Sequence, residues 1–65
     1  MKGYERRVIE ELRELELKMK ALNGFMHCSG FEYVNSVDKG LLMVQIRAMR
    51  LYAETLQSRI ERFSL

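Results

Sequence analysis

The sequence predicts an all-α fold, an antiparallel helical hairpin with a short connector turn, assembled as a homo-oligomeric helical bundle. Apolar residues recur at spacings of three and four along two long stretches, and the chain contains no proline to interrupt either of them. A chain of 65 residues is also small. Domains of this size bury only about 60% of their unfolded surface, and they usually need disulfides, a metal ion or further copies of themselves. We expect one domain over residues 1–65, with helices at about 4–23 and 37–63 and a connector at 24–36.

The first helix is predicted from one apolar stripe, with acidic side chains crowded into its first half and lysines near its end, as the helix dipole favours. The stripe consists of Tyr4, Val8, Leu12, Leu15, Met19, Leu22 and Met26. Asn23 and Gly24 follow, and both tolerate the left-handed conformation that commonly ends a helix. We therefore expect the helix to stop there.

The connector has no sustained period, but Phe25, Phe31 and Tyr33 make it too apolar for a mobile loop. We expect a short helical turn folded back over the open end of the hairpin. His27 and Cys28 are adjacent there, and neighbours in sequence rarely point at each other as a catalytic pair does. They are also too few for a structural zinc site, which takes four ligands. The expectation is a partly buried free thiol and a packed or exposed imidazole.

The second helix is predicted to begin with Ser36 as its N-cap and Asp38 in the first turn. Its apolar residues follow a heptad seam made of Leu42, Ile46, Met49, Ala53, Leu56, Ile60 and Phe63. Further apolar residues lie off the two seams, at Ile9, Leu17, Ala21, Leu41, Val44, Ala48 and Leu51. A lone hairpin would leave these exposed to water, so they predict a dimer or a higher assembly.

Charge and composition exclude several functions. Eleven basic residues against nine acidic ones give a net charge of +2, a milder excess than is typical of proteins dedicated to binding long nucleic acid. No apolar run is long enough for a membrane span or a signal peptide, so we expect a cytoplasmic protein without a membrane partner. No nucleophile lies beside a base at a recognisable spacing, and Gly24 and Gly30 are not followed by the lysine of a phosphate loop. We expect no catalysis, no cofactor and no metal.

The polar side of the second helix carries the strongest functional signal. Gln45, Tyr52 and Arg59 are spaced by seven, so they line one face of the helix. An amide, an aromatic ring and a guanidinium suit a nucleotide, because the ring stacks on a base and the guanidinium takes a phosphate. The candidate ligand-binding residues are Tyr4, Arg7, Gln45, Arg47, Met49, Tyr52 and Arg59. Arginine and tyrosine on a helix are, however, also typical of protein interfaces.

Several segments resemble a family of very short phage and prophage proteins that are related to a crAss-like phage protein. They are residues 4–11, 12–22 and 41–45, with Phe25, Phe31, Met49, Tyr52 and the residues Leu56, Arg59, Ile60 and Phe63. The hairpin is similar in turn to a domain of phage sponge proteins, which oppose the CBASS and Thoeris defence systems. Those sponges bind cyclic oligonucleotide or cyclic ADP-ribose signals between subunits of a homo-oligomer. The resemblance implies that this chain sequesters such a signal without cleaving it, within an infected bacterial cell.

Two other interpretations remain open on the sequence. The arginine and tyrosine face could dock on a host protein, which would make the chain a small inhibitor or assembly factor. Arg47, Arg50, Arg59 and Arg62 could instead contact the phosphates of a long nucleic acid, against which the nine acidic residues count.

Overall fold

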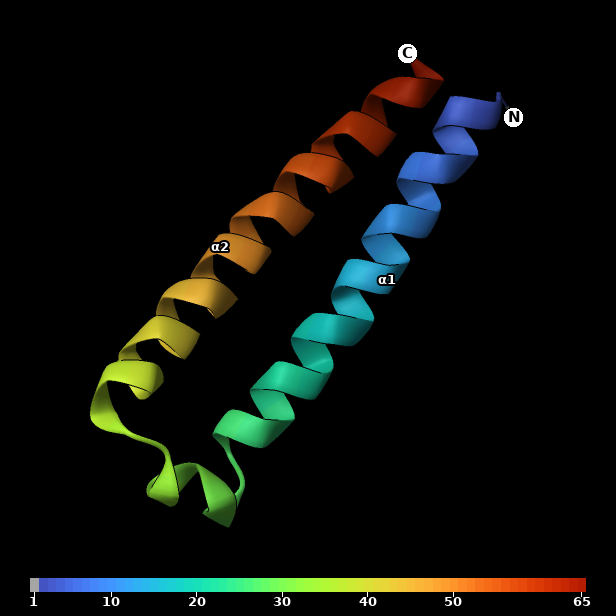
Figure 1. The fold of residues 1–65 in the computed structure, drawn as a ribbon. Coiled ribbons are helices and arrows are strands. Elements are labelled where there is room, and N and C mark those ends of the chain that lie inside the picture. The colour runs from blue at the N-terminus through green and yellow to red at the C-terminus, as the bar shows by residue number, and fades with distance from the viewer. Residues whose placement is uncertain (1) are drawn as a thin grey trace.

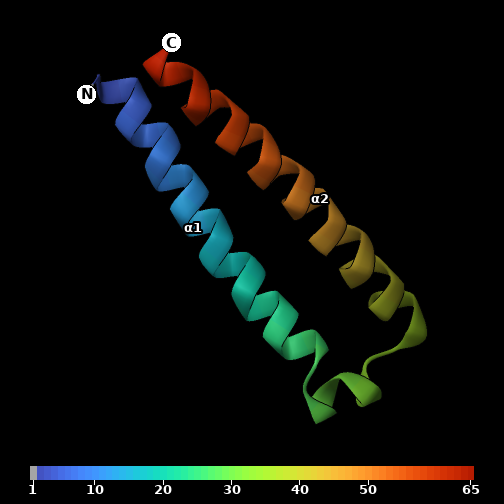
Figure 2. The ribbon, with the colours of Figure 1, turned by 180° about the vertical axis from the view of Figure 1, so that it is seen from behind.

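Two long helices lie side by side and antiparallel, as Figures 1 and 2 show from opposite sides. The structure is a computed structural model that describes residues 2–65. Helix α1 spans Gly3–Met26 and helix α2 spans Ser36–Glu61, with short 3-10 helices η1 at Ser29–Tyr33 and η2 at Arg62–Ser64. The result is a rod of 46 × 15 × 14 Å with both chain ends at one end of it. The predicted all-helical hairpin is confirmed.

The core is a narrow seam between the helices. Its buried cluster consists of Val8, Leu12 and Leu15 from α1 and Leu56 from α2, and Leu56 alone among the described residues is fully enclosed. Partly buried side chains extend the seam in both directions, namely Met19, Met49, Ala53, Ile60 and Phe63. The predicted apolar stripes therefore face each other. Because each helix buries only one side, the hairpin has little interior for its length.

Helix α1 continues past the predicted stop at Asn23 and Gly24 and ends at Met26. No described residue has a positive φ, so Gly24 adopts an ordinary helical conformation and not the left-handed one. Two contacts support the extra turn. The Nδ1 atom of His27 lies 2.8 Å from the carbonyl oxygen of Asn23, and the ring of Phe25 meets that of Phe31 edge-to-face, with centroids 5.9 Å apart. The prediction of the helix end was wrong because it used backbone preference alone.

The connector contains the predicted helical turn, η1, and a side chain of α2 contacts this turn. The ammonium of Lys39 lies over the ring of Phe31, 5.4 Å from its centroid, and donates to the carbonyl oxygen of Glu32 at 3.3 Å. Cation–π contacts of this kind contribute about 0.5–1 kcal/mol at exposed sites. Cys28 is a free and exposed cysteine, so the expectation of a partly buried thiol was wrong.

Asn35, and not Ser36, is the N-cap of α2. The backbone N–H of Val37 donates to the side-chain Oδ1 of Asn35 at 2.8 Å, and Ser36 is already the first helical residue. Asn and Ser cap helices about equally well, so the two neighbouring candidates could not be separated by residue type.

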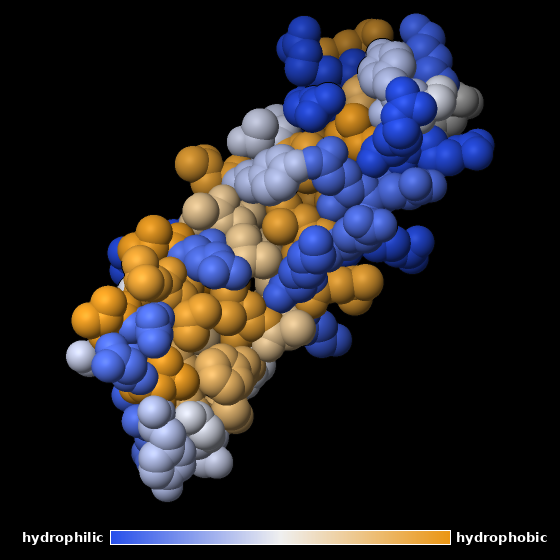
Figure 3. Space-filling model, viewed as in Figure 1, coloured by the Kyte–Doolittle hydropathy of each residue, from blue (hydrophilic) through white to orange (hydrophobic). Residues whose placement is uncertain are grey.

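An apolar stripe runs along the side of α2 that faces away from α1. We call it the outer stripe, and it consists of Val37, Leu41, Val44, Ala48, Leu51 and Thr55. Its four large members are 61–68% exposed. Figure 3 shows hydrophobic side chains gathered over α2 in the half of the rod nearer the connector, while hydrophilic ones dominate the other half. In the described residues, neither helix is long and apolar enough to cross a bilayer.

Candidate functional site

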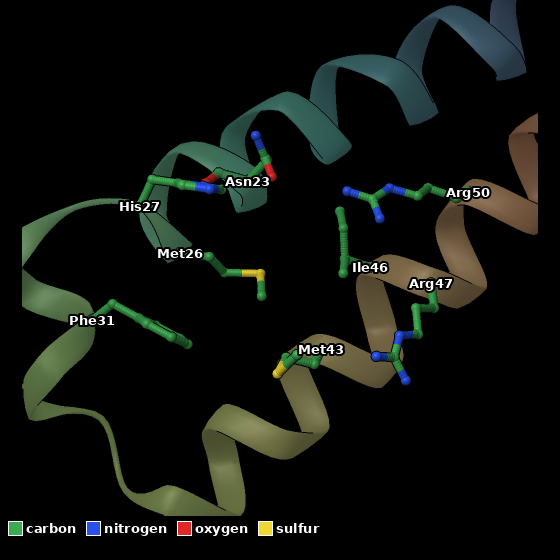
Figure 4. A pocket seen from close by; sticks show the side chains of 8 residues that line it. All are labelled: Asn23, Met26, His27, Phe31, Met43, Ile46, Arg47 and Arg50. Atoms are coloured by element: carbon green, nitrogen blue, oxygen red, sulfur yellow. The ribbon is translucent and has the colours of Figure 1, made fainter.

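A pocket of about 340 Å³ lies at the connector end of the rod, between the last turn of α1, η1 and the first half of α2. Figure 4 shows the side chains that surround it. They are Asn23, Met26, His27, Phe31, Met43, Ile46, Arg47 and Arg50. Its volume is at the lower end of the range of small-molecule sites.

Arg47 and Arg50 form one lip of the pocket. They are separated by three positions, so they project from the same side of α2, one helical turn apart. Both are exposed, and the eight lining residues, all in the described part of the chain, include no carboxylate. Two guanidinium groups offer paired donors to phosphate or carboxylate oxygens. This lip therefore favours an anion.

Asn23 and His27 form the opposite lip, on the last turns of α1. The carbonyl oxygen of Asn23 can only accept, so the Nδ1 atom of His27, 2.8 Å away, carries the hydrogen. In the neutral ring the Nε2 atom is then an acceptor. The side-chain amide of Asn23 adds two donors and an acceptor, so this lip can hydrogen-bond the edge of a polar ring.

The floor of the pocket is apolar. Met26 comes from the end of α1, Phe31 comes from η1, and Met43 and Ile46 come from α2. Methionine side chains adapt to irregular shapes and make favourable contacts with aromatic rings. A flat ring can therefore rest on this floor while charged groups attached to it reach the arginines.

The predicted ligand-binding residues do not all come together within one hairpin: Tyr4, Arg7 and Arg59 lie toward its open end, and Arg47 does not. Arg47 lines the pocket. Arg59 is in the last turn of α2, about 18 Å further along the helix at a rise of 1.5 Å per residue. Tyr4 is at the open end of the hairpin, where its ring meets Phe63 edge-to-face with centroids 5.8 Å apart. The side chain of Arg7 extends toward Gly3 in the first turn of α1, so its guanidinium group lies near Gly3.

The three remaining predicted residues lie along the middle of α2. Met49 is partly buried against the core cluster, so its side chain is occupied in packing. Gln45 and Tyr52 are exposed. The tyrosine is 45% exposed, so one part of its ring is packed and another part is available for contact.

Sequence reasoning left out three polar residues of the pocket, namely Asn23, His27 and Arg50. Asn23 was interpreted only as a helix stop, and His27 was set aside because it adjoins Cys28. Arg50 was noted beside Arg47 on the polar side of the second helix, but it was given a role only as a contact to long nucleic acid. Its spacing of three from Arg47 was the available signal. The described residues contain no group of three or more potential metal ligands.

Comparison with known proteins places the chain among small phage proteins. The model of a family described as Sequestin matches residues 2–62. An uncharacterised 7.5 kDa protein from the denB-rIIB intergenic region of Enterobacteria phage T4 is 41% identical over 63 residues, which cover 97% of this chain and 98% of that protein. No solved structure matches the chain significantly.

Proposed function

The chain belongs to the Sequestin family, and from this premise we propose that it sequesters a cyclic nucleotide signal and so shields an infecting phage from a host defence of the CBASS or Thoeris type. The family name suggests sequestration, and the relative from phage T4 supports a phage origin. The proposal depends on one observation, the pocket with two arginines on its lip and an apolar floor.

Each part of a nucleotide has a chemically suitable surface in this pocket. The base rests on Phe31 and the methionines, in the manner of base stacking on aromatic rings, which contributes about 1–3 kcal/mol per base. Arg47 and Arg50 bind the phosphate. Asn23 reads the polar edge of the base.

Binding of this kind requires no bond to be made or broken. The polar atoms lining the pocket are two guanidinium groups, one amide and one imidazole. A histidine without a nucleophile or an acidic partner in the lining has nothing to activate. The ligand therefore leaves chemically unchanged, and the protein lowers the free concentration of the signal by mass action.

One pocket is too small for a whole cyclic dinucleotide. At about 340 Å³ it accommodates one base with its phosphate. Tight sequestration at nanomolar affinity corresponds to about 12 kcal/mol, which one open pocket hardly supplies. We therefore propose that the binding unit is a homo-oligomer in which each chain provides one pocket.

A thermal-shift panel of cyclic dinucleotides, cyclic trinucleotides and cyclic ADP-ribose isomers tests the proposal. One class should raise the melting temperature by several degrees, because a ligand that binds only the folded state stabilises it. Arg47→Ala and Arg50→Ala should remove this shift. Arg13→Ala is the matched control, since Arg13 is exposed on α1 and does not line the pocket. Recovery of intact ligand after heat denaturation distinguishes storage from hydrolysis.

The same panel decides between the two locations of basic residues. If Arg59→Ala and Tyr52→Ala remove the shift and the pocket variants do not, the ligand binds along the middle and open end of α2. A flat response across the panel from a folded protein would reject the nucleotide. The chain would then be better explained as a small protein that docks on a host protein.

A further inference from the structure

The outer stripe has the spacing of a second helix-packing seam, although no helix of the hairpin covers it. Its six positions alternate in steps of four and three from Val37 to Thr55, over about 27 Å of helix. Thr55 belongs to it because its hydroxyl donates to the carbonyl oxygen of Leu51 at 2.9 Å. That bond satisfies the polar group of Thr55 within α2, so its methyl group can pack.

The stripe is complementary to itself. Its midpoint along α2 is at the level of residue 46. Stripe positions at equal distances on either side of this level have matching apolar character. When a second copy of α2 is laid antiparallel about this centre, Val37 faces the partner's Thr55. In the same way Leu41 faces the partner's Leu51, and Val44 faces the partner's Ala48. Every position of the stripe then meets an apolar group.

Antiparallel pairing is favoured over parallel pairing by the small residue near the centre. A parallel pair in register would place Ala48 against the partner's Ala48 and leave a gap there. The antiparallel pair sets Ala48 against a valine, and alternating small and large side chains across a seam gives close packing. The dipoles of adjacent helices also oppose each other in this arrangement.

Charges at the edges of the stripe do not decide the register. Another antiparallel register would pair Arg47 with the partner's Glu54, at the cost of moving Val37 and Leu41 away from apolar partners. Exposed ion pairs contribute little to stability, whereas four large side chains per copy that are more than 60% exposed provide a substantial hydrophobic gain. The apolar match therefore determines the register.

We propose that a second copy of this chain packs antiparallel on the outer stripe, centred on residue 46, and that the guanidinium groups of the two Arg47 side chains meet beside the two-fold axis. Arg47 flanks the centre of the stripe on the same side as the pocket, which it also lines. The two pockets therefore open on one face of the dimer, with the arginine pair between them. Like charges placed together at an interface oppose association, so the dimer is strengthened by a multiply charged anion at this point.

Sedimentation of the full chain tests the surface. The wild-type protein should be a dimer at micromolar concentration. Leu41→Glu and Leu51→Glu should each raise the dimer dissociation constant by about 100-fold or more, because each substitution places a carboxylate from both copies in the buried interface. Leu17→Glu is the matched control, since Leu17 is 64% exposed on α1 against 66% for Leu51, and it should leave the dimer intact. A monomeric wild type, or equal effects of the three variants, would overturn the proposal.

Two further measurements test the arrangement. In a Cys28→Ser background, the Val44→Cys/Ala48→Cys pair should form a covalent dimer on mild oxidation, and crosslinking by Ala48→Cys alone would indicate parallel helices and reject the proposal.

Arg47→Gln should tighten the anion-free dimer about threefold to tenfold by removing the repulsion between the two Arg47 guanidinium groups. Inorganic pyrophosphate at constant ionic strength should tighten the wild-type dimer and leave Arg47→Gln unchanged. An equal effect of pyrophosphate on both, or a weaker dimer for Arg47→Gln, would show that the two arginines do not meet. These results do not depend on any nucleotide, so they can fail separately from the proposed function.

Discussion

Three leucines in very different surroundings provide a direct test of the packing. Leu56 is fully enclosed between the helices, Leu17 is 64% exposed on α1, and Leu51 is 66% exposed in the outer stripe. Each can be changed to alanine with little effect on helix propensity, because leucine and alanine both favour helices. Leu56→Ala removes buried methyl groups and leaves a cavity, which costs about 2–5 kcal/mol. A chain of this length has a total stability of only about 3–10 kcal/mol, so roughly half of it would be lost.

The two exposed leucines separate a hairpin from an assembly. Leu17→Ala should change the free energy of unfolding by no more than about 0.5 kcal/mol at any protein concentration. In dilute solution Leu51→Ala should change the free energy of unfolding as little as Leu17→Ala does. At higher protein concentration Leu51→Ala should become more destabilising than Leu17→Ala, because dimerisation stabilises the folded state by mass action. Urea unfolding followed by far-UV circular dichroism, at two concentrations about 100-fold apart, measures all three effects. If Leu56→Ala costs no more than Leu17→Ala, the packing of the two helices is wrong.

Three further substitutions test the local structure, each by its effect on the free energy of unfolding in urea. Gly24→Ala should stabilise the protein by about 0.5–1 kcal/mol, because Gly24 is helical and nothing lies within 4 Å of the added methyl group; destabilisation would instead indicate a left-handed cap. Asn35→Ala should cost about 0.5–2 kcal/mol through loss of the cap, and Ser36→Ala much less; the reverse order would make Ser36 the cap. Tyr4→Leu, which keeps an apolar side chain, should cost about 0.5–1.5 kcal/mol through the lost ring contact with Phe63, and no change would mean that the open end is frayed.

The sequence was sufficient to predict the helices and their facing sides, because apolar spacing reports which side of a helix is buried. Leu12 and Leu56 were placed correctly on this basis. The end of α1 was not, since the contact between Phe25 and Phe31 that extends it joins residues brought together only by folding. Local preference at Gly24 therefore gave the wrong helix end.

The candidate site was predictable only in part, for the same reason. Arg47 was selected from the sequence as part of a basic and aromatic face. The pocket that it lines needs Met26 from the last turn of α1 and Phe31 from η1, and no spacing rule relates those positions to α2. Heptad spacing aligned Arg59 with Gln45 and Tyr52, but alignment on one side of a long helix does not place side chains within reach of a common ligand.

The position of the chain ends has a practical consequence. Both termini emerge at the tip of the rod farthest from the connector, on a molecule 46 Å long. An affinity tag, a fluorescent reporter or a surface tether attached to either terminus is therefore held well away from Asn23 and Arg47. Immobilised or labelled protein can be used for biosensor work without obstructing the entrance that a small molecule would use.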